Sequence, residues 1–97
     1  MPTHEEAEAF WRDWAKLTPA QRNMFRASVA VFIADLRAGR GFRRGLRVKK
    51  MSGHDAVWEM SWAPDGRATF EFGAQQQPGE RHIVWRRIGT HDIFDRP

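Results

Sequence analysis

A histidine that closely follows two arginines at the end of a predicted strand is the strongest candidate for chemistry in this sequence. Residues 83–88 alternate around β-branched and aromatic side chains and predict a strand that ends in Arg86 and Arg87. Gly89 interrupts the run, and His91 follows two residues later. Such an end brings guanidinium groups and an imidazole together, which could bind a phosphate and transfer a proton. The alternative is a strand end with solvated charges and a histidine that caps a turn.

The positive charge of the chain is concentrated in one segment. The net charge is +4, from 16 Lys and Arg residues against 12 Asp and Glu residues. Residues 37–50 contain no acidic residue and carry Arg37, Arg40, Arg43, Arg44, Arg47, Lys49 and Lys50. A block of this kind indicates a surface for nucleic acid, for another anion or for an acidic partner. A solvated basic loop is the alternative interpretation.

Six cations fall on predicted strands of one small sheet, with His91 at its edge: Arg47, Lys49, Lys50, Arg67, Arg86 and Arg87. Cleavage of an RNA phosphodiester needs a base for the 2′-OH proton, an acid for the leaving oxygen, and positive charge for the transition state. Histidine suits either proton role near neutral pH, and arginine suits the charge role. The pattern therefore favours phosphodiester chemistry, without selecting it over simple anion binding.

Several other classes of site are excluded by the residues present. Without cysteine the chain has no disulfide and no thiolate metal site. The histidines lack metal-ligand spacing, and neither a phosphate-binding loop nor a nucleophile elbow occurs. No apolar run approaches the ~20 residues of a membrane span, and the acidic N-terminus lacks the apolar region of a signal peptide. We therefore expect a cytoplasmic protein that uses no metal, cofactor or membrane.

Two helices are predicted within residues 5–38. The first covers residues 5–16, with an apolar stripe formed by Ala7, Phe10, Trp11, Trp14 and Leu17. The second begins with the capping sequence Thr18-Pro19-Ala20-Gln21 and ends near Ala38, before Gly39. Its stripe is formed by Met24, Phe25, Val29, Phe32, Ile33 and Leu36. The short connection between the helices predicts an antiparallel hairpin.

The remainder of the chain predicts a sheet of about four strands. A glycine-rich basic loop spans residues 39–45, and strands follow at 46–51, 57–63, 67–73 and 82–88 within a sheet region of about 46–94. In the first strand Arg47 and Lys49 share one face, whereas Lys50 shares the other with apolar neighbours and is expected to be partly buried. Pro64-Asp65-Gly66 predicts a hairpin turn. Residues 1–97 thus form one α+β domain, with the helical hairpin packed on the sheet.

With these elements in place, the chain resembles the RelE/ParE superfamily of bacterial toxins from about Leu17 onward. The resemblance rests on the helical hairpin, the basic strand, the hairpin Val-Trp-Glu-Met-Ser-Trp…Asp-Gly-Arg-Ala-Thr-Phe, and the ending His-Ile-Val-Trp-Arg-Arg-Ile-Gly-Thr-His-Asp-Ile-Phe. The Gly89-Thr90-His91 ending is most similar to the YafQ-type branch. The resemblance implies a curved, mainly antiparallel sheet under the helices.

The resemblance also implies a function. Such proteins are toxins of type II toxin–antitoxin systems, and most nuclease members cut mRNA on the ribosome without a metal and so inhibit translation. An antitoxin with an acidic segment neutralises them in a toxin–antitoxin hetero-oligomer. His91 matches the catalytic histidine of the YafQ-type branch, Arg67 the arginine after the hairpin turn, and Glu59 a common strand glutamate. Arg47, Lys49 and Lys50, together with Arg86 and Arg87, would bind RNA.

The sequence also departs from the family pattern. No first strand is evident, because residues 1–9 predict an acidic helix. Ser61 stands where many members have a basic residue, and Trp62 where the YafQ type has a second histidine. Tyrosine is absent from the chain. Two alternatives to the ribonuclease therefore stay open: a ParE-like gyrase poison, and a catalytically weak binding module of the same fold.

Overall fold

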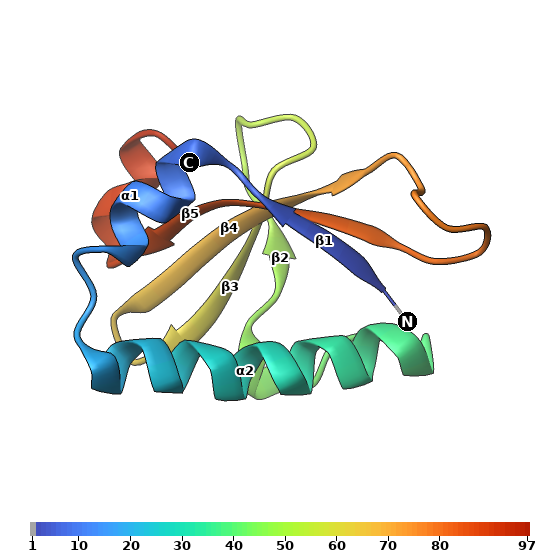
Figure 1. The fold of residues 1–97 in the computed structure, drawn as a ribbon, viewed down its shortest axis with the longest axis horizontal. Helices are drawn as coiled ribbons and strands as arrows, with labels where there is room; N and C mark the ends of the chain where they lie inside the picture. The colour runs from blue at the N-terminus through green and yellow to red at the C-terminus, as the bar shows by residue number, and fades with distance from the viewer. Residues whose placement is uncertain (1) are drawn as a thin grey trace.

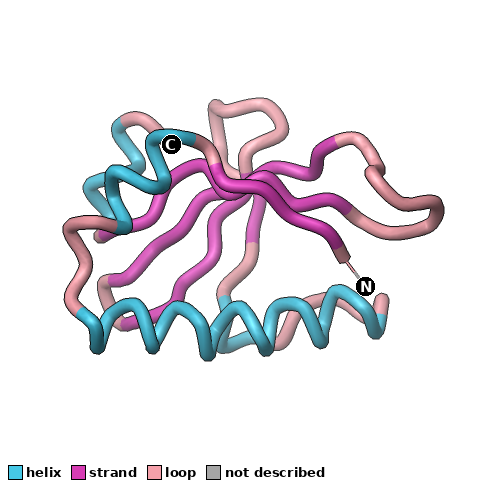
Figure 2. Tube along the Cα trace, in the orientation of Figure 1, coloured by secondary structure: helices cyan, strands magenta, loops and turns pink. Residues whose placement is uncertain are grey.

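The computed structural model describes residues 2–97 as one α+β unit. Five strands form a single sheet in the order β1-β5-β4-β3-β2, and every neighbouring pair is antiparallel except β1 with β5. The long helix α2 crosses one face of the sheet, and the short helix α1 lies at one end (Figures 1 and 2). In chain order the elements are β1 (Thr3–Glu6), α1 (Glu8–Trp14), α2 (Pro19–Ala38), the 3₁₀ turn η1 (Arg44–Leu46), β2 (Lys49–Lys50), β3 (Trp58–Ala63), β4 (Gly66–Gly73), β5 (His82–Gly89) and the 3₁₀ turn η2 (His91–Asp95).

The prediction that the N-terminal residues belong to a helix is wrong. Residues 3–6 form β1, which pairs in parallel with β5 from Thr3 opposite His82 to Glu6 opposite Trp85. The buried His82 holds the strand in place, because its Nδ1 lies 2.7 Å from the Thr3 hydroxyl and its Nε2 lies 2.9 Å from a Glu5 carboxylate oxygen. These partners lie almost eighty positions away in the chain, so local helix propensity gave no indication of them. Met1, which the same prediction covered, lies outside the described residues.

Helix α1 continues along the edge of β5 that β1 leaves open. The Ala7 N–H donates to the Trp85 carbonyl at 2.8 Å. One turn further, the buried Asp13 carboxylate accepts the Ile88 N–H at 3.1 Å and binds the Arg87 guanidinium at 2.6 and 3.0 Å. The Asp13 side chain thus accepts a hydrogen bond from a backbone N–H on the edge of β5 that would otherwise lack a partner.

Replacing Asp13 with alanine is expected to lower the free energy of unfolding by roughly 3 kcal/mol, the lower end for breaking a buried ion pair, since Arg87 keeps some contact with solvent. The variant leaves both the guanidinium and the Ile88 N–H without their acceptor. Chemical denaturation followed by tryptophan fluorescence measures the change. Glu8→Ala is the matched control, because Glu8 contacts Arg12 at 3.4 Å with both side chains largely exposed, and such pairs contribute little. Equal effects of the two variants would contradict the prediction.

Helix α2 begins and ends where the sequence predicts. The Thr18 hydroxyl accepts the Gln21 N–H at 3.1 Å, and the Gln21 side chain accepts the Thr18 N–H at 2.8 Å, which completes the capping box. Gly39 ends the helix in the left-handed conformation with φ of 68°. The two predicted helices differ in length, since α1 has seven residues and α2 has twenty. They are in contact through Phe10 and Trp14 of α1, whose rings both lie 5.9 Å from that of Phe25.

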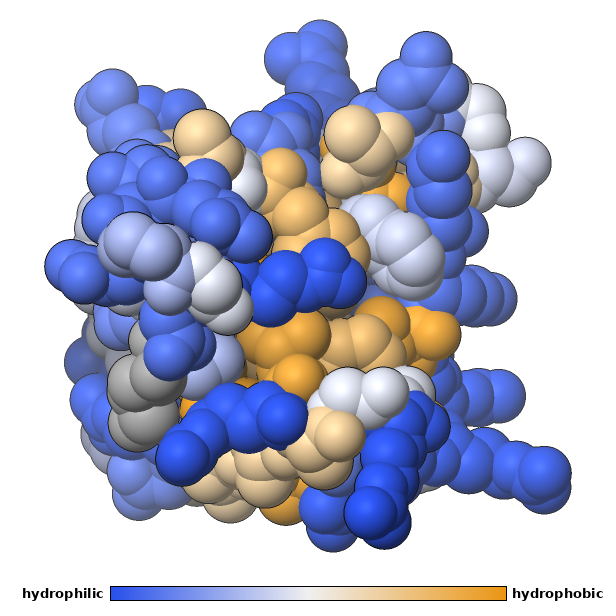
Figure 3. Space-filling view, turned by 90° about the vertical axis from the view of Figure 1, so that its right-hand side faces the viewer, coloured by the Kyte–Doolittle hydropathy of each residue, from blue (hydrophilic) through white to orange (hydrophobic). Residues whose placement is uncertain are grey.

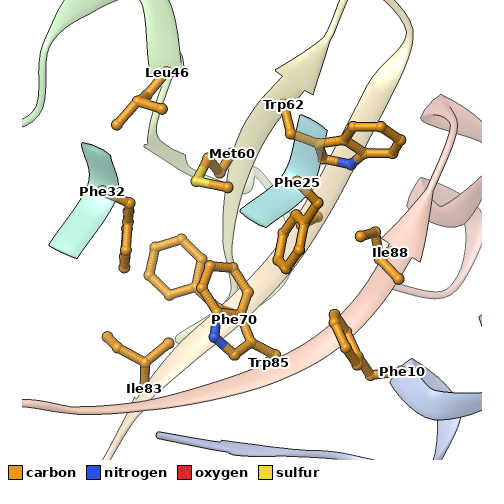
Figure 4. Packing of buried hydrophobic residues seen from close by; sticks show 11 residues of the cluster. Phe10, Phe25, Phe32, Leu46, Met60, Trp62, Phe70, Ile83, Trp85 and Ile88 are labelled. Atoms are coloured by element: carbon orange, nitrogen blue, oxygen red, sulfur yellow. The ribbon is translucent and has the colours of Figure 1, made fainter. Parts of the chain in front are cut away.

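The core lies between α2 and the sheet, where Phe25 and Phe32 of the helix meet aromatic and aliphatic side chains of β3, β4 and β5 (Figure 4). Phe32 and Phe70 are fully buried. Two residues of the predicted apolar stripes lie outside this core: Trp11 is 52% exposed and Met24 is 44% exposed. At the end of the molecule shown in Figure 3, apolar side chains also reach the surface between hydrophilic ones. The helix therefore covers the sheet without closing over it completely.

The predicted strand at residues 46–51 is only partly correct. β2 contains two residues, Lys49 and Lys50, and both are exposed. Leu46 belongs instead to η1 and is buried in the core, and Arg47 follows in the left-handed conformation with φ of 49°. The backbone reversal at Arg47 means that Arg47 and Lys49 do not share a strand face as predicted. Lys50 is exposed and not partly buried as predicted, because β2 is a two-residue strand at the edge of the sheet.

Candidate functional site

The structure brings His91 to the turn between β3 and β4. The imidazole Nδ1 donates to a carboxylate oxygen of Asp65 at 2.8 Å, and Nε2 lies 3.5 Å from a carboxylate oxygen of Asp92. His91 begins the 3₁₀ turn η2, whose start is capped by the Thr90 hydroxyl through the Asp92 N–H at 3.3 Å. The His91 side chain is 67% exposed, so a large ligand can reach its Nε2.

This arrangement favours the protonated imidazole. The pKa of His91 is raised, first by the hydrogen bond to Asp65 and then by the charges of Asp65 and Asp92, while weak desolvation and the charge of Arg67 act in the opposite direction. The pKa of Asp65 is lowered, chiefly by the same hydrogen bond. His91 therefore holds its proton at a pH where a free histidine begins to lose it, which suits a general acid.

Replacing Asp65 with asparagine is expected to lower the pKa of His91, because the amide removes a charge while keeping an oxygen in place. The imidazole resonances in an NMR titration report this pKa directly. Asp92→Asn, which removes the weaker influence, should move it less. A His91 pKa that is unchanged in Asp65→Asn would contradict the assignment.

The same pair has a consequence for stability. Because the folded-state pKa of His91 is raised above its ordinary value of 6.5, the pair stabilises the fold fully at pH below that value, and this contribution is lost as the pH rises through the folded-state pKa. In Asp65→Asn, the free energy of unfolding should therefore differ less between mildly acidic and alkaline buffers than it does in the wild type.

Arg67, the second residue of β4, lies beside this pair and is held by the turn itself. One guanidinium nitrogen donates to the carbonyl oxygens of Ala63, Pro64 and Gly66 at 3.3, 3.2 and 2.9 Å. Its charge acts on both His91 and Asp65. Gly66 makes the close turn possible, since a Cβ there would lie 2.6 Å from the Trp62 ring. The turn thus supplies a cation whose position is set before any ligand binds.

Glu59 lies on the same sheet face as Arg67, two residue pairs further along the β3–β4 ladder. β3 and β4 pair Ser61 with Arg67 and Glu59 with Thr69, and alternation places Glu59 and Ser61 on one face. The Glu59 side chain is only 12% exposed and its carboxylate lies 3.9 Å from the Lys49 ammonium. Glu59, its cross-strand neighbour Lys49 and Arg67 therefore lie along one face of the sheet.

The structure places Arg86 and Arg87 in intramolecular contacts away from His91. Arg86 binds a Glu71 carboxylate oxygen at 3.0 Å and the Pro97 carbonyl at 3.1 Å. Arg87 binds Asp13 and donates to the Arg96 carbonyl at 3.0 Å. These two arginines hold α1 and the C-terminal residues against the sheet.

Comparison with known proteins yields matches in structure and none in sequence: no family model and no curated protein matches the chain. The DinJ–YafQ complex from E. coli matches with a TM-score of 0.67 at 12% identity, over 96% of this chain and 97% of that one. The RelB–RelE antitoxin–toxin complex from Methanococcus jannaschii matches with a TM-score of 0.62 at 16% identity, over 93% and 94%. The YoeB/ParE toxin from Agrobacterium tumefaciens matches with a TM-score of 0.65 at 12% identity, over 92% and 98%.

The chain has the RelE-like fold. The predicted α+β, RelE-like fold is thereby confirmed, although the sheet has five strands instead of about four, because β1 was predicted as helix. Neither helix of residues 2–97 has the length and apolar character of a membrane span.

One residue of the site on this RelE-like fold was missed in the sequence. Asp65 was predicted only as part of a turn, yet it is the hydrogen-bond partner of His91. The two residues lie 26 positions apart, and no local pattern links them. Only the pairing of β4 with both β3 and β5 brings the turn and the end of β5 together, through Arg67 opposite Gly89.

Proposed function

We propose that this protein is the toxin of a type II toxin–antitoxin system and acts as a metal-independent endoribonuclease that cleaves mRNA on the ribosome. The observation that carries the proposal is the His91–Asp65 hydrogen bond beside Arg67, a proton donor and a preorganised cation at one turn. The RelE-like fold supports it, because the similar structures include toxins and toxin–antitoxin complexes.

In the proposed reaction the ribose 2′-oxygen attacks the adjacent phosphorus. Glu59 accepts the 2′-OH proton, and protonated His91 donates a proton from Nε2 to the 5′-oxygen as the P–O5′ bond breaks. The products are a 2′,3′-cyclic phosphate and a free 5′-hydroxyl. Arg67 stabilises the charge that develops on the phosphorus oxygens. Asp65 keeps the imidazole in position through Nδ1, and the substrate oxygen takes the place of the exposed Asp92 carboxylate, which lies 3.5 Å from Nε2.

The exposed cations Arg47, Lys49 and Lys50 serve this reaction by binding the RNA backbone. Arg86 and Arg87 take only a secondary part in RNA binding in this proposal, because each is already ion-paired, with Glu71 and Asp13 respectively. The acid-free basic segment 37–50 also suits an antitoxin whose acidic segment folds along it in a toxin–antitoxin hetero-oligomer. Like RelB–RelE and DinJ–YafQ, the protein would be stored as a complex of toxin and antitoxin.

Primer extension on a cellular message during induced expression tests the proposed activity. Discrete new ends in the message, at sites occupied by ribosomes, are the expected result. Intact messages accompanied by DNA damage would replace the ribonuclease with a ParE-like gyrase poison. Growth that continues with neither effect would leave a binding module of the same fold.

A further inference from the structure

A hollow of about 420 Å³ lies on the α2 side of the candidate site, where β3 has a free edge. β2 pairs only with Trp58 and Glu59, so within residues 2–97 no strand covers the second half of β3. The hollow is bordered by α2, by η1 and by the turn between β3 and β4. Its lining comprises Met24, Ser28, Gly45, Leu46, Arg47, Ser61, Trp62, Ala63, Pro64 and Arg67.

The polar groups of this hollow are rich in hydrogen-bond donors. Arg47 and Arg67 contribute two guanidinium groups, and Ser28 and Ser61 contribute hydroxyls. Of the described residues that line it, none is acidic and none carries a side-chain amide. The walls are otherwise apolar. A ligand that fits such a hollow presents acceptor atoms along one edge and an apolar face on each side.

Two residues that line the hollow, Met24 and Trp62, would contact a bound ligand or report on its binding. Met24 is 44% exposed although it lies on the apolar stripe of α2. The Trp62 indole N–H is buried and has no hydrogen-bond partner within the described part of the chain. A flexible thioether is well suited to contact the face of an aromatic ring.

We infer that this hollow binds a guanine base of the RNA substrate, an inference that rests on the proposed ribonuclease function. Guanine presents O6 and N7 as adjacent acceptors, which an arginine fork recognises in bidentate fashion. Adenine and cytosine present an amino donor on the corresponding edge, and a guanidinium group, which has no acceptor atom, cannot bind it. Exposed Arg47 is the residue that would bind guanine O6 and N7, because the Arg67 guanidinium already donates to the turn carbonyls.

The position of the hollow suits a base next to the cleaved bond. Arg67 lines the hollow and also acts on the charge of His91. A second hollow of about 400 Å³ shares Met24, Trp62, Ala63 and Pro64 with the first and continues to Asp65 and Thr90. A nucleotide with its base against Arg47 would therefore place a phosphodiester at the turn that carries the catalytic groups.

Titration with free mononucleotides, followed by NMR of the indole N–H signals, tests the guanine site without the ribosome. Trp62→Phe identifies the Trp62 signal. GMP is expected to shift that signal, whereas AMP, inorganic phosphate and 7-deaza-GMP, which lacks the N7 acceptor, should bind at least about tenfold more weakly. Equal shifts with GMP, AMP and phosphate would overturn the inference in favour of a general anion site. No shift with GMP, or a shift only with an acidic peptide, would also overturn it.

Substitutions at Arg47 sharpen the test. Arg47→Gln is expected to weaken GMP binding about tenfold or more, and Arg47→Lys should keep the charge but lose the preference for GMP over AMP. Arg44→Gln is the matched control, since Arg44 begins the 3₁₀ turn that Arg47 follows, is exposed and does not line the hollow. Equal loss in the Arg44 and Arg47 variants would contradict base recognition.

The two proposals fail in different ways. If GMP binds at Trp62 and messages stay intact, the guanine site stands while the ribonuclease does not. If messages are cut irrespective of guanine and Trp62 does not respond to GMP, the ribonuclease stands and the guanine site is wrong.

Discussion

His91→Ala is expected to abolish growth arrest and to lower the rate of message cleavage by about a hundredfold to ten-thousandfold, the usual contribution of a general acid. The imidazole is the titratable group whose proton is held by Asp65 at a turn that a large substrate can reach. Its side chain is mostly exposed, so the variant should unfold at nearly the wild-type temperature.

Two further variants make this test specific to the proton. His91→Gln can still donate to Asp65, so it preserves the turn contact while removing the titratable group, and it should be as inactive as His91→Ala. His54→Ala is the matched control, because His54 is exposed in the loop between β2 and β3. Cleavage at the wild-type rate by His91→Gln would show that His91 only positions the turn.

Arg67→Ala is expected to lower the single-turnover cleavage rate at saturating ribosomes by about a hundredfold, which corresponds to roughly 3 kcal/mol of lost transition-state stabilisation. Arg67 is held by three turn carbonyls before substrate arrives, so its charge needs no reorganisation during the reaction. Thermal unfolding of the variant measures how much the loss of these contacts loosens the turn. Arg67→Lys keeps the charge without the fork and should recover part of the rate.

Lys49→Ala provides the contrast to Arg67→Ala. Lys49 is 70% exposed on an edge strand, and its nearest carboxylate is 3.9 Å away. Its removal should weaken ribosome binding and reduce the salt slope by about one unit, with the saturated rate unchanged. The division of roles is wrong if Arg67→Ala cleaves at the wild-type rate once saturated, or if Lys49→Ala loses rate without losing affinity.

The elements that depend on local signals could be predicted from the sequence. Thr18, Pro19 and Gln21 mark the start of α2, and Gly39 marks its end, because capping and the left-handed conformation involve only neighbouring residues. The strands β3, β4 and β5 are also close to their predicted bounds, since each combines alternation with a turn signal. These elements and the sequence motifs were sufficient to predict the RelE-like fold.

The predictions were wrong where contacts between residues far apart in the chain set the backbone conformation. Residues 3–6 have the composition of a helix start, yet they form β1 because β5 offers them a strand edge and His82 offers two hydrogen bonds. The segment around Arg47 alternates as a strand does, yet burial of Leu46 in the core turns it into η1. Neither the pairing of residues 3–6 with β5 nor the burial of Leu46 can be predicted from the local sequence pattern.

The same division applies to the site. Alternation and turn signals were enough to predict that His91 and Arg67 lie at the ends of two strands, and the residue count alone located the positive charge between Arg37 and Lys50. Which groups contact one another became known from the fold: Asp65 with His91, Arg67 with the turn carbonyls, and Arg87 with Asp13. Hydrogen bonds and ion pairs form at distances of about 3 Å, and strand pairing sets these distances between residues far apart in the chain.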